Sequence, residues 1–245
     1  MIKLYAKQLR LPTLTQVDDI VRQAQEDGLG YEAFLCEVLQ REICQREENQ
    51  QHRRVRQARF PLDKSLDTLD IKRLIPLEEA VIWQLATGEF VKRRENVIMI
   101  GNPGRGKTHL AIGLGRRMCG YGFKVKFYTA AGLINELLAA QQEYRLNKLE
   151  KQWLAPHLVI LDELGYVPFS KVGAELLFQF CSSRYERGSL IITTNLEFPK
   201  WTEVLGDEQM TAALLDRLTH NAHILNINGE SYRFKQALSK QTSID

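Results

Sequence analysis

The segment GNPGRGKT, from Gly101 to Thr108, has the residue types and spacing that bind the phosphates of a nucleotide. It fits the pattern GxxxxGK[ST] without exception, and its glycines let the backbone turn with positive φ and approach phosphate closely. The N–H groups of the loop and of the helix that follows point at the anion. We expect Lys107 to reach the β- and γ-phosphates of ATP, and the Thr108 hydroxyl to coordinate Mg²⁺. The predicted nucleotide-binding residues are Gly101, Asn102, Pro103, Gly104, Arg105, Gly106, Lys107, Thr108 and His109.

Two acidic residues follow an apolar run in LVILDELG, residues 158–165. The run predicts a central strand, and Asp162 at its carboxyl end is placed to hold the Mg²⁺ shell, as an aspartate does in P-loop enzymes. Glu163 is placed to polarise a water molecule for attack on the γ-phosphate. The plainer interpretation is a pair of solvated acids at a strand end. The phosphate loop about 55 residues upstream favours ATP hydrolysis instead.

Two later residues complete the predicted catalytic set. Asn195 follows the run SLIITT and is expected to position the attacking water, although asparagine is also common in turns after strands. Arg217, in ALLDRLTH, could reach the nucleotide of a neighbouring subunit and stabilise the charge of the transition state. A surface ion pair with Asp216 is the alternative for Arg217. Arg184 and Arg187 compete with it for the catalytic role.

The chain that must position these residues alternates between strands and helices from Val97 onward. Short apolar runs, each followed by a helical pattern except the last, are VIMI, KVKFYT, HLVIL, SLIITT and HILNI. Strands that alternate with helices of this length predict an α/β fold with a parallel sheet flanked by helices on both faces. The phosphate loop, the acidic pair and Asn195 then all lie at the carboxyl ends of strands.

The first part of the chain has a different character. Residues 1–60 are predicted to form a small all-helical domain, in which Gly28 and Gly30 end one helix and a longer one begins near Tyr31. Pro61 ends the long helix. The sequence therefore predicts two domains, residues 1–60 and 61–245, with a connector before the first strand.

The charge and composition of the chain are compatible with several kinds of partner. The formal net charge is +3 and the sequence pI about 8.6, which allows a nucleic-acid partner without demanding one. The first residues have neither a long apolar core nor a small-residue cleavage site, so they do not read as a signal peptide. No segment offers 18 uninterrupted apolar residues, so no membrane span is expected. The chain is expected to be cytoplasmic.

Two basic segments could contact DNA phosphates. Arg145, Lys148 and Lys151 fall at spacings of three, so one face of a helix could present all of them. An arginine-rich segment near residues 53–59 is the second, and a solvated helix face is the alternative for both. No aromatic interleaving indicates base stacking, so binding to the backbone of duplex DNA without base readout is expected.

Taken in order, these motifs resemble those of the AAA+ ATPases. The chain is more specifically similar to the IstB-type transposition helper ATPases. The segments that carry the resemblance are RRVRQARFP, LEEAVIWQLATGEFV, GNPGRGKTHLAIGLG, LVILDELGYVPF, LIITTN, LLDRLTH and NGESYRFK. The DnaC-type helicase loaders share the ATPase core and are its nearest cousins.

The resemblance implies properties that the residues alone do not show. Such helpers bind duplex DNA with little sequence preference, form ATP-dependent homo-oligomers on it and recruit a transposase, and their N-terminal helices mediate assembly and partner contacts. In this sequence the implied nucleotide residues are the loop 101–108, Asp162, Glu163, Asn195 and Arg217, and the region after the second strand faces DNA. Because only about 20 residues follow Asn226, no separate C-terminal helical lid is expected.

Three other functions are compatible with parts of this pattern. A helicase loader shares the core, and the N-terminal half and the ending NGESYRFK argue against it. A small-molecule kinase usually carries an arginine-rich lid where this chain has GYVPFSKVG. A binding module with ATP as a static ligand would not need the intact pair of Asp162 and Glu163.

Overall fold

The computed structural model describes residues 1–71, 74 and 76–227, apart from the side chains of residues 15 and 16. Contacts divide the chain into a unit of residues 1–53 and a unit that starts at Arg54. This division lies inside the long helix, and the functional boundary near residue 60 stays a prediction. The segment NGESYRFK and the expectation of no C-terminal lid concern residues 228–245, which lie outside the described residues.

The N-terminal unit is built from helices around a small apolar centre. Ala6, Val17, Ile20, Ala24 and Val38 are its buried apolar residues. Gly28 has a φ of 64° after the second helix, as its place in the sequence predicts. The elements, in chain order, are α1 (Ile2–Gln8), the 3-10 helix η1 (Pro12–Gln16), α2 (Val17–Glu26) and α3 (Tyr31–Ala58), which continues into the second unit.

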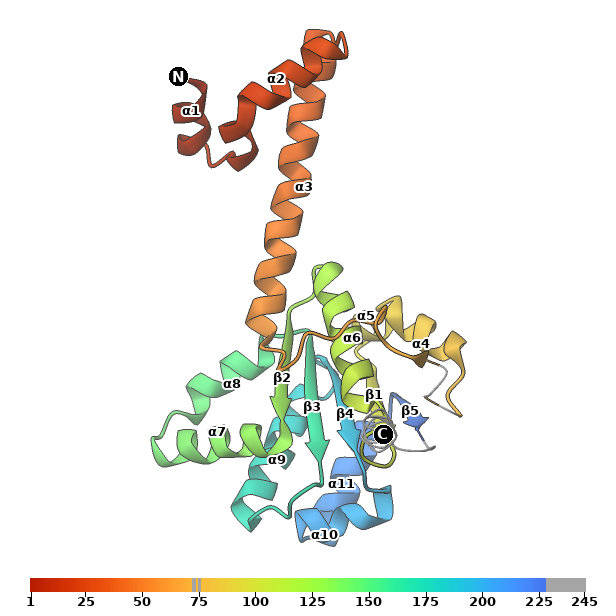
Figure 1. Cartoon of the computed structure of the whole chain (residues 1–245). Helices are drawn as coiled ribbons and strands as arrows, with labels where there is room; N and C mark the ends of the chain where they lie inside the picture. Colours follow the sequence, from red (N-terminus) through yellow and green to blue (C-terminus); the bar gives the residue numbers. More distant parts are fainter. Residues whose placement is uncertain (72–73, 75, 228–245) are drawn as a thin grey trace, which may run out of the picture. The chain divides into compact units, whose positions relative to one another are not determined.

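A five-stranded parallel sheet forms the centre of the second unit (Figure 1). Its strands are β1 (Asn96–Ile100), β2 (Val125–Thr129), β3 (Leu158–Leu164), β4 (Ser189–Thr194) and β5 (Ala222–Asn226). They lie in the order β2-β3-β4-β1-β5, and every neighbouring pair is parallel. All five strands predicted from the sequence are therefore confirmed. Their order puts β4 between β1, which ends at the phosphate loop, and β3, which carries the acidic pair.

Helices cover both faces of this sheet, because successive strand residues point to opposite faces. One apolar cluster joins Met99 and Ile160 of the strands to the helices α4, α5 and α6. The other joins Ile98 and Val159 to α7, α8, α9, α10 and α11. The helices are α4 (Glu79–Ala86), α5 (Glu89–Lys92), α6 (Lys107–Gly120), α7 (Ala130–Gln142), α8 (Leu146–Leu154), α9 (Lys171–Arg184), α10 (Trp201–Leu205) and α11 (Glu208–Thr219), with a short 3-10 helix η3 (Phe198–Lys200) before α10.

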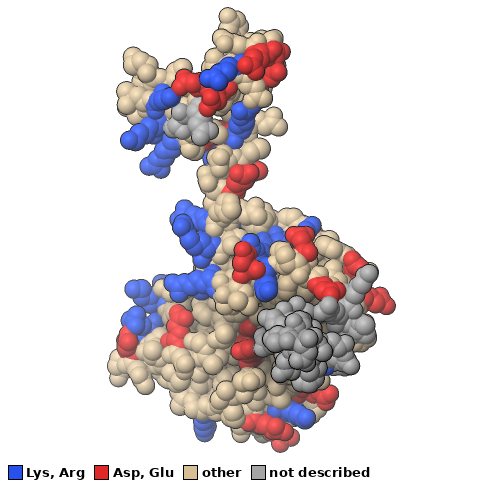
Figure 2. Space-filling view, in the orientation of Figure 1, with Lys and Arg blue, Asp and Glu red and all other residues tan. Residues whose placement is uncertain are grey.

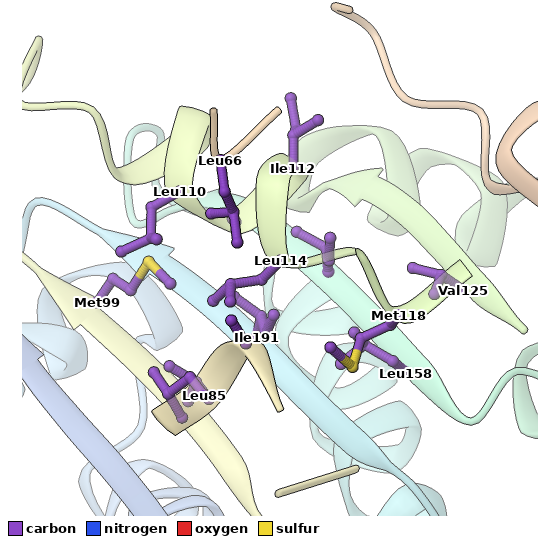
Figure 3. Packing of buried hydrophobic residues seen from close by; sticks show 14 of the residues in the cluster. Leu66, Leu85, Met99, Leu110, Ile112, Leu114, Met118, Val125, Leu158 and Ile191 are labelled. Carbon is purple, nitrogen blue, oxygen red and sulfur yellow. The ribbon is translucent and has the colours of Figure 1, made fainter. Parts of the chain in front are cut away.

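Helix α6, which begins at the phosphate loop, packs closely against the connector and the sheet. Figure 3 shows Leu110 and Leu114 of this helix among the apolar side chains that pack with Leu66 of the connector. A Cβ added at Gly113 would lie 2.8 Å from the side chain of Leu66, and one at Gly115 would lie 2.7 Å from that of Ile160. These glycines let the connector and the sheet approach the helix backbone. The helix is thereby fixed between the strand that carries Asp162 and the connector. No described helix is both long and apolar enough to cross a membrane.

Candidate active site

The phosphate loop turns sharply from the end of β1 into α6. Gly104 and Gly106 have φ values of 78° and 92°, in the left-handed region that favours glycine. At Gly101 the reason is space, since a Cβ there would lie 2.0 Å from the carbonyl oxygen of Ile227. The glycines singled out from the sequence thus have distinct roles in shaping one anion-binding turn at a helix N-terminus.

The Lys107 ammonium group is folded back over this loop. Its Nζ donates hydrogen bonds to the carbonyl oxygens of Gly101, at 2.5 Å, and of Asn102, at 2.9 Å. These contacts place a positive charge above the turn whose N–H groups also attract anions. A triphosphate at this position would meet the ammonium group and the helix N-terminus together.

Thr108 and Asp162 lie together although they are 54 residues apart in the chain. The Thr108 hydroxyl donates to both carboxylate oxygens of Asp162, at 3.0 and 3.1 Å. Asp162 is only 3% exposed, and its carboxylate is one of few buried charged groups in the described residues. A hydroxyl and a carboxylate beside a phosphate site are the oxygen donors that Mg²⁺ prefers, so these two residues fit the predicted metal site.

Glu163 differs from Asp162 in backbone conformation and in exposure. Its φ is 60°, and the pairing of β3 with β4 shifts register between Leu161 and Leu164, so the residue sits in a bulge-like irregularity. The side chain is exposed, whereas that of Asp162 is buried. A non-glycine residue with positive φ stores strain, and such strain is concentrated at functional sites. The bulge therefore lets two adjacent residues differ. The Asp162 carboxylate is buried beside Thr108, and the Glu163 carboxylate is exposed to solvent.

Thr193 on β4 holds both acidic residues, and the sequence reasoning did not identify it. Its hydroxyl donates to Oδ1 of Asp162 and accepts the backbone N–H of Glu163 at 3.0 Å. Thr193 is 1% exposed, so these bonds are shielded from water. A threonine two residues before Asn195 in a predicted strand was the available signal, but its neighbours depend on the strand order.

Asn195 lies at the carboxyl end of β4, next to the phosphate loop. The Gly101 N–H donates to the carbonyl oxygen of Thr194 at 3.2 Å, and the Asn195 side chain is exposed. The structure therefore brings Lys107, Asp162 and Asn195 to one edge of the sheet, as the sequence predicts. Their roles in binding and hydrolysis stay predictions.

The connector before β1 lies against α6, which the sequence did not reveal. Nε2 of His109 lies 2.9 Å from the carbonyl oxygen of Ser65 and 3.1 Å from Oγ1 of Thr68. Burial, opposed by the Ser65 hydrogen bond and aided by the charge of Lys64, lowers the pKa of His109. His109 thus contacts the connector, and its contact with nucleotide stays a prediction.

Arg105 is the one residue of the described loop with buried side-chain nitrogens that lack a hydrogen-bond partner. Among the described residues, its Nε and Nη1 atoms belong to a short list of buried side-chain nitrogens and oxygens that have no hydrogen-bond partner. A buried guanidinium N–H without an acceptor is costly. These two nitrogens lie in the loop predicted to bind phosphate, and the nucleotide-binding role of Arg105 stays a prediction.

The three candidate arginines are in different environments. Arg184 is 1% exposed and donates to the backbone carbonyls of Trp153, Pro156 and Ser189, and its burial lowers its pKa to about 10. It is a structural residue and cannot reach another subunit, so it is withdrawn as a candidate. Arg187 is exposed.

Arg217 remains the leading candidate for the arginine that would reach a neighbouring subunit. It is half-buried on α11, where its guanidinium donates to the carbonyl oxygen of Ala213 at 2.7 Å and lies 5.2 Å from the ring centre of Phe178. The next residue, Leu218, accepts a hydrogen bond from Asn96, the first residue of β1. Arg217 is therefore at the edge opposite the phosphate loop, about 15 Å away for a strand of this length. It does not face the nucleotide site of its own chain.

The predicted DNA-contact residues lie on and beside α8. Leu146 and Leu149 pack against the core, and Trp153 is buried with its Nε1 donating to Ser183 at 3.0 Å. This leaves Arg145, Lys148 and Lys151 exposed on the outer side of the helix. Figure 2 shows blue side chains over the α8 side of this unit, with some red among them. In the second basic segment, Arg54 already has a partner within the chain, because its guanidinium donates to the carbonyl oxygen of Cys119 at 2.7 Å.

Comparison with known proteins decides which family has this arrangement. The family of IstB-like ATP binding proteins matches residues 4–240. The chain belongs to the IstB-like family. An ATP-binding protein of insertion sequence IS21 from Pseudomonas aeruginosa is 41% identical over 220 residues, which cover 90% of this chain and 83% of that protein. One of insertion sequence IS5376 from Geobacillus stearothermophilus is 35% identical and covers 95% and 93% of the two chains.

Solved structures support the fold assignment. The DnaC helicase loader superposes with a TM-score of 0.52 at 23% identity, covering 60% of this chain and 86% of that one. AMPPCP-bound DnaA from Aquifex aeolicus has a TM-score of 0.59 at 15% identity, covering 76% and 56%. At these identities the likeness concerns the fold alone. This IstB-like chain is thus an ATPase of the insertion-sequence type, and its α/β core with an N-terminal helical region has the fold predicted from the sequence.

Proposed function

We propose that this IstB-like ATPase is a transposition helper that forms homo-oligomers on duplex DNA when ATP is bound, and that recruits or regulates a cognate transposase in the cytoplasm. The observation that carries the proposal is the position of Arg217. It lies at the sheet edge opposite the phosphate loop of its own chain, next to the start of β1. If an arginine completes hydrolysis, it must come from another copy, which couples turnover to assembly.

The residues of the site divide the work of hydrolysis. Lys107 and the loop N–H groups would bind and orient the phosphates, and Thr108 with Asp162 would hold Mg²⁺. The bound Mg²⁺ would neutralise charge on the phosphate oxygens. Glu163 would accept the proton of the attacking water, which Asn195 orients, and a neighbour's Arg217 would stabilise charge in the transition state.

Two observations support transposition rather than helicase loading. The relatives with the highest identity given above are insertion-sequence proteins that align with almost the whole chain. The DnaC helicase loader covers only 60% of it and supports the fold alone. Relatives of this kind imply a transposase as the protein partner, and the exposed basic side of α8 supports contact with DNA phosphates.

ATP hydrolysis measured with and without random-sequence duplex DNA, across a salt series, tests the proposal. We expect stimulation by DNA that fades as salt rises, because phosphate contacts release counterions. Lys107→Ala, which removes the ammonium group from the phosphate loop, is the background control. Hydrolysis that is indifferent to DNA at every salt concentration would contradict the proposal and favour a protein-remodelling role such as helicase loading.

A further inference from the structure

Tyr144 forms the tip of the turn between α7 and α8 and exposes 98% of its surface. Its φ is 53°, in the left-handed region where a bulky residue is an outlier. The Arg145 N–H donates to the carbonyl oxygen of Ala140 at 2.7 Å, and the Tyr144 N–H to that of Gln141 at 3.1 Å. This is the hydrogen-bond pattern of a helix end at which glycine is the usual residue.

Folding gives no reason for a tyrosine at this position. The left-handed backbone costs a residue with a Cβ about 1–2 kcal/mol, a cost that glycine avoids. The ring recovers none of it by packing, because it is almost completely exposed. A strained backbone together with an unburied aromatic ring indicates that Tyr144 serves a contact outside its own chain.

The surroundings of Tyr144 identify the chemistry of that contact. Arg145 follows it directly, and Lys148 and Lys151 continue along the outer side of α8, all three exposed. Glu143 is the acid nearest in sequence, and it forms an ion pair with Arg145 at the surface. Exposed pairs of this kind are weak, so Arg145 can exchange its partner for a phosphate. An aromatic tip beside three cations matches a polyanion that also carries stacked rings.

We propose that Tyr144 is a wedge that inserts its ring against the bases of duplex DNA, while Arg145, Lys148 and Lys151 contact the flanking phosphates. The inference rests on the proposed DNA-binding function. It departs from the expectation of contact with the DNA backbone alone, because it adds a stacking contact that the basic residues would not provide. Side chains inserted between base steps add contact that is tolerant of sequence, because every base has a π-face. The ring is uncharged, so its contribution should not depend on salt.

The test compares Tyr144→Gly with Tyr144→Phe in the full chain, using fluorescence anisotropy of a labelled random-sequence duplex and a non-hydrolysable ATP analogue across a salt series. We expect Tyr144→Gly to bind at least about fivefold more weakly at every salt concentration, with the same salt dependence as the original chain. Its Tm should nevertheless rise by about 1–3 °C, because strain is relieved. Tyr144→Phe keeps the ring and the strained backbone, so it should have the DNA affinity and the Tm of the original chain.

Lys148→Ala provides the electrostatic comparison, since it should lower the slope of log affinity against log salt by about one. Tyr144→Ala is a second ring deletion that keeps the strained backbone, and it should bind as weakly as Tyr144→Gly. Duplex affinity unchanged in both ring deletions would overturn the wedge but leave the DNA-binding function intact. So would a loss of transposase binding without a loss of DNA binding. If the original chain binds no duplex at any salt, the proposed function itself fails.

Discussion

At the residue scale, the hydroxyl of Thr193 is the contact that Asp162 and Glu163 share. It donates to the carboxylate of Asp162 and accepts the backbone N–H of Glu163, and the Thr193 and Asp162 side chains are both buried. Each carboxylate can then have its own task, one toward the predicted metal and one toward the predicted water. Thr193 is therefore a positioning residue for the proposed hydrolysis.

We expect Thr193→Val to lower kcat for ATP hydrolysis by about 10- to 100-fold, since a hydrogen bond to a charged group is worth about 1.5–3 kcal/mol. The KM for ATP should change little, because the phosphate loop is untouched. Thr193→Ser keeps the hydroxyl and should restore most of the turnover. Steady-state kinetics of the two variants provide the measurement.

A matched control separates this effect from a loss of stability. Thr211 is also buried, and its hydroxyl donates to the carbonyl oxygen of Asp207 at 2.6 Å, so its hydrogen bond involves neither Asp162 nor Glu163. Thr211→Val should reduce Tm to a similar extent as Thr193→Val and keep its turnover. Equal kcat losses in the two variants would refute the positioning role of Thr193.

Glu163→Gln is expected to bind ATP with near-normal affinity and to hydrolyse it about 10²- to 10⁴-fold more slowly, since a general base contributes in this range. Single-turnover hydrolysis and equilibrium nucleotide binding check the two halves of this expectation. Glu175→Gln, which neutralises an exposed acid on α9, is the control. Undiminished turnover of Glu163→Gln would remove this residue from the mechanism.

At the element scale, the N-terminal unit depends on a buried carboxylate. Glu42 on α3 is 4% exposed and accepts hydrogen bonds from the Thr13 backbone N–H at 3.2 Å, from the Thr13 hydroxyl, and from Arg46 at 2.7 Å. Burial acts to raise the pKa of Glu42, but these hydrogen bonds outweigh it and the pKa is lowered. The ionised carboxylate thus links η1 to α3.

A lowered pKa gives this link a defined pH dependence. The folded form holds the proton less tightly than the unfolded chain, so Glu42 stabilises the fold above the unfolded pKa of about 4.3, and the stabilisation is lost as pH falls through the lower folded value. We expect Glu42→Gln to lower Tm at pH 7 and to reduce the difference in Tm between pH 7 and about pH 3, a pH well below the unfolded pKa. Thermal unfolding followed by circular dichroism measures both. An unchanged difference would show that Glu42 does not contribute to the pH dependence.

At the scale of the whole molecule, the nucleotide loop and Arg217 lie at opposite edges of one sheet. A single chain therefore carries two incomplete halves of the proposed catalytic site, and two chains in head-to-tail contact would complete one. Such heterologous contacts form rings or open filaments. This arrangement explains why hydrolysis would report on assembly rather than on ATP binding alone.

Mixing two inactive variants tests this division. We expect Arg217→Ala to bind nucleotide normally and to lose about 10³-fold or more in hydrolysis, as an arginine finger does. When it is mixed in equal amounts with Glu163→Gln, about a quarter of the contacts in a head-to-tail assembly should join two intact halves, so activity should return. Arg187→Ala tests the competing arginine and should retain activity. A mixture without recovered activity would contradict action in trans.

The sequence by itself determined the local elements and the chemistry of each motif. Five apolar runs specified the strands, and Gly104 and Gly106 specified a turn that requires positive φ, because these features depend on neighbours in the chain. The pairing of Thr108 with Asp162 was also predictable from the motifs. Only the tertiary structure placed β4 between β1 and β3, and this order brings Thr193 to both acids. It likewise buried Arg184, laid the connector against α6 and left Tyr144 exposed at a strained turn. Contacts between residues far apart in the chain depend on how the elements pack, and local periodicity carries no information about that packing.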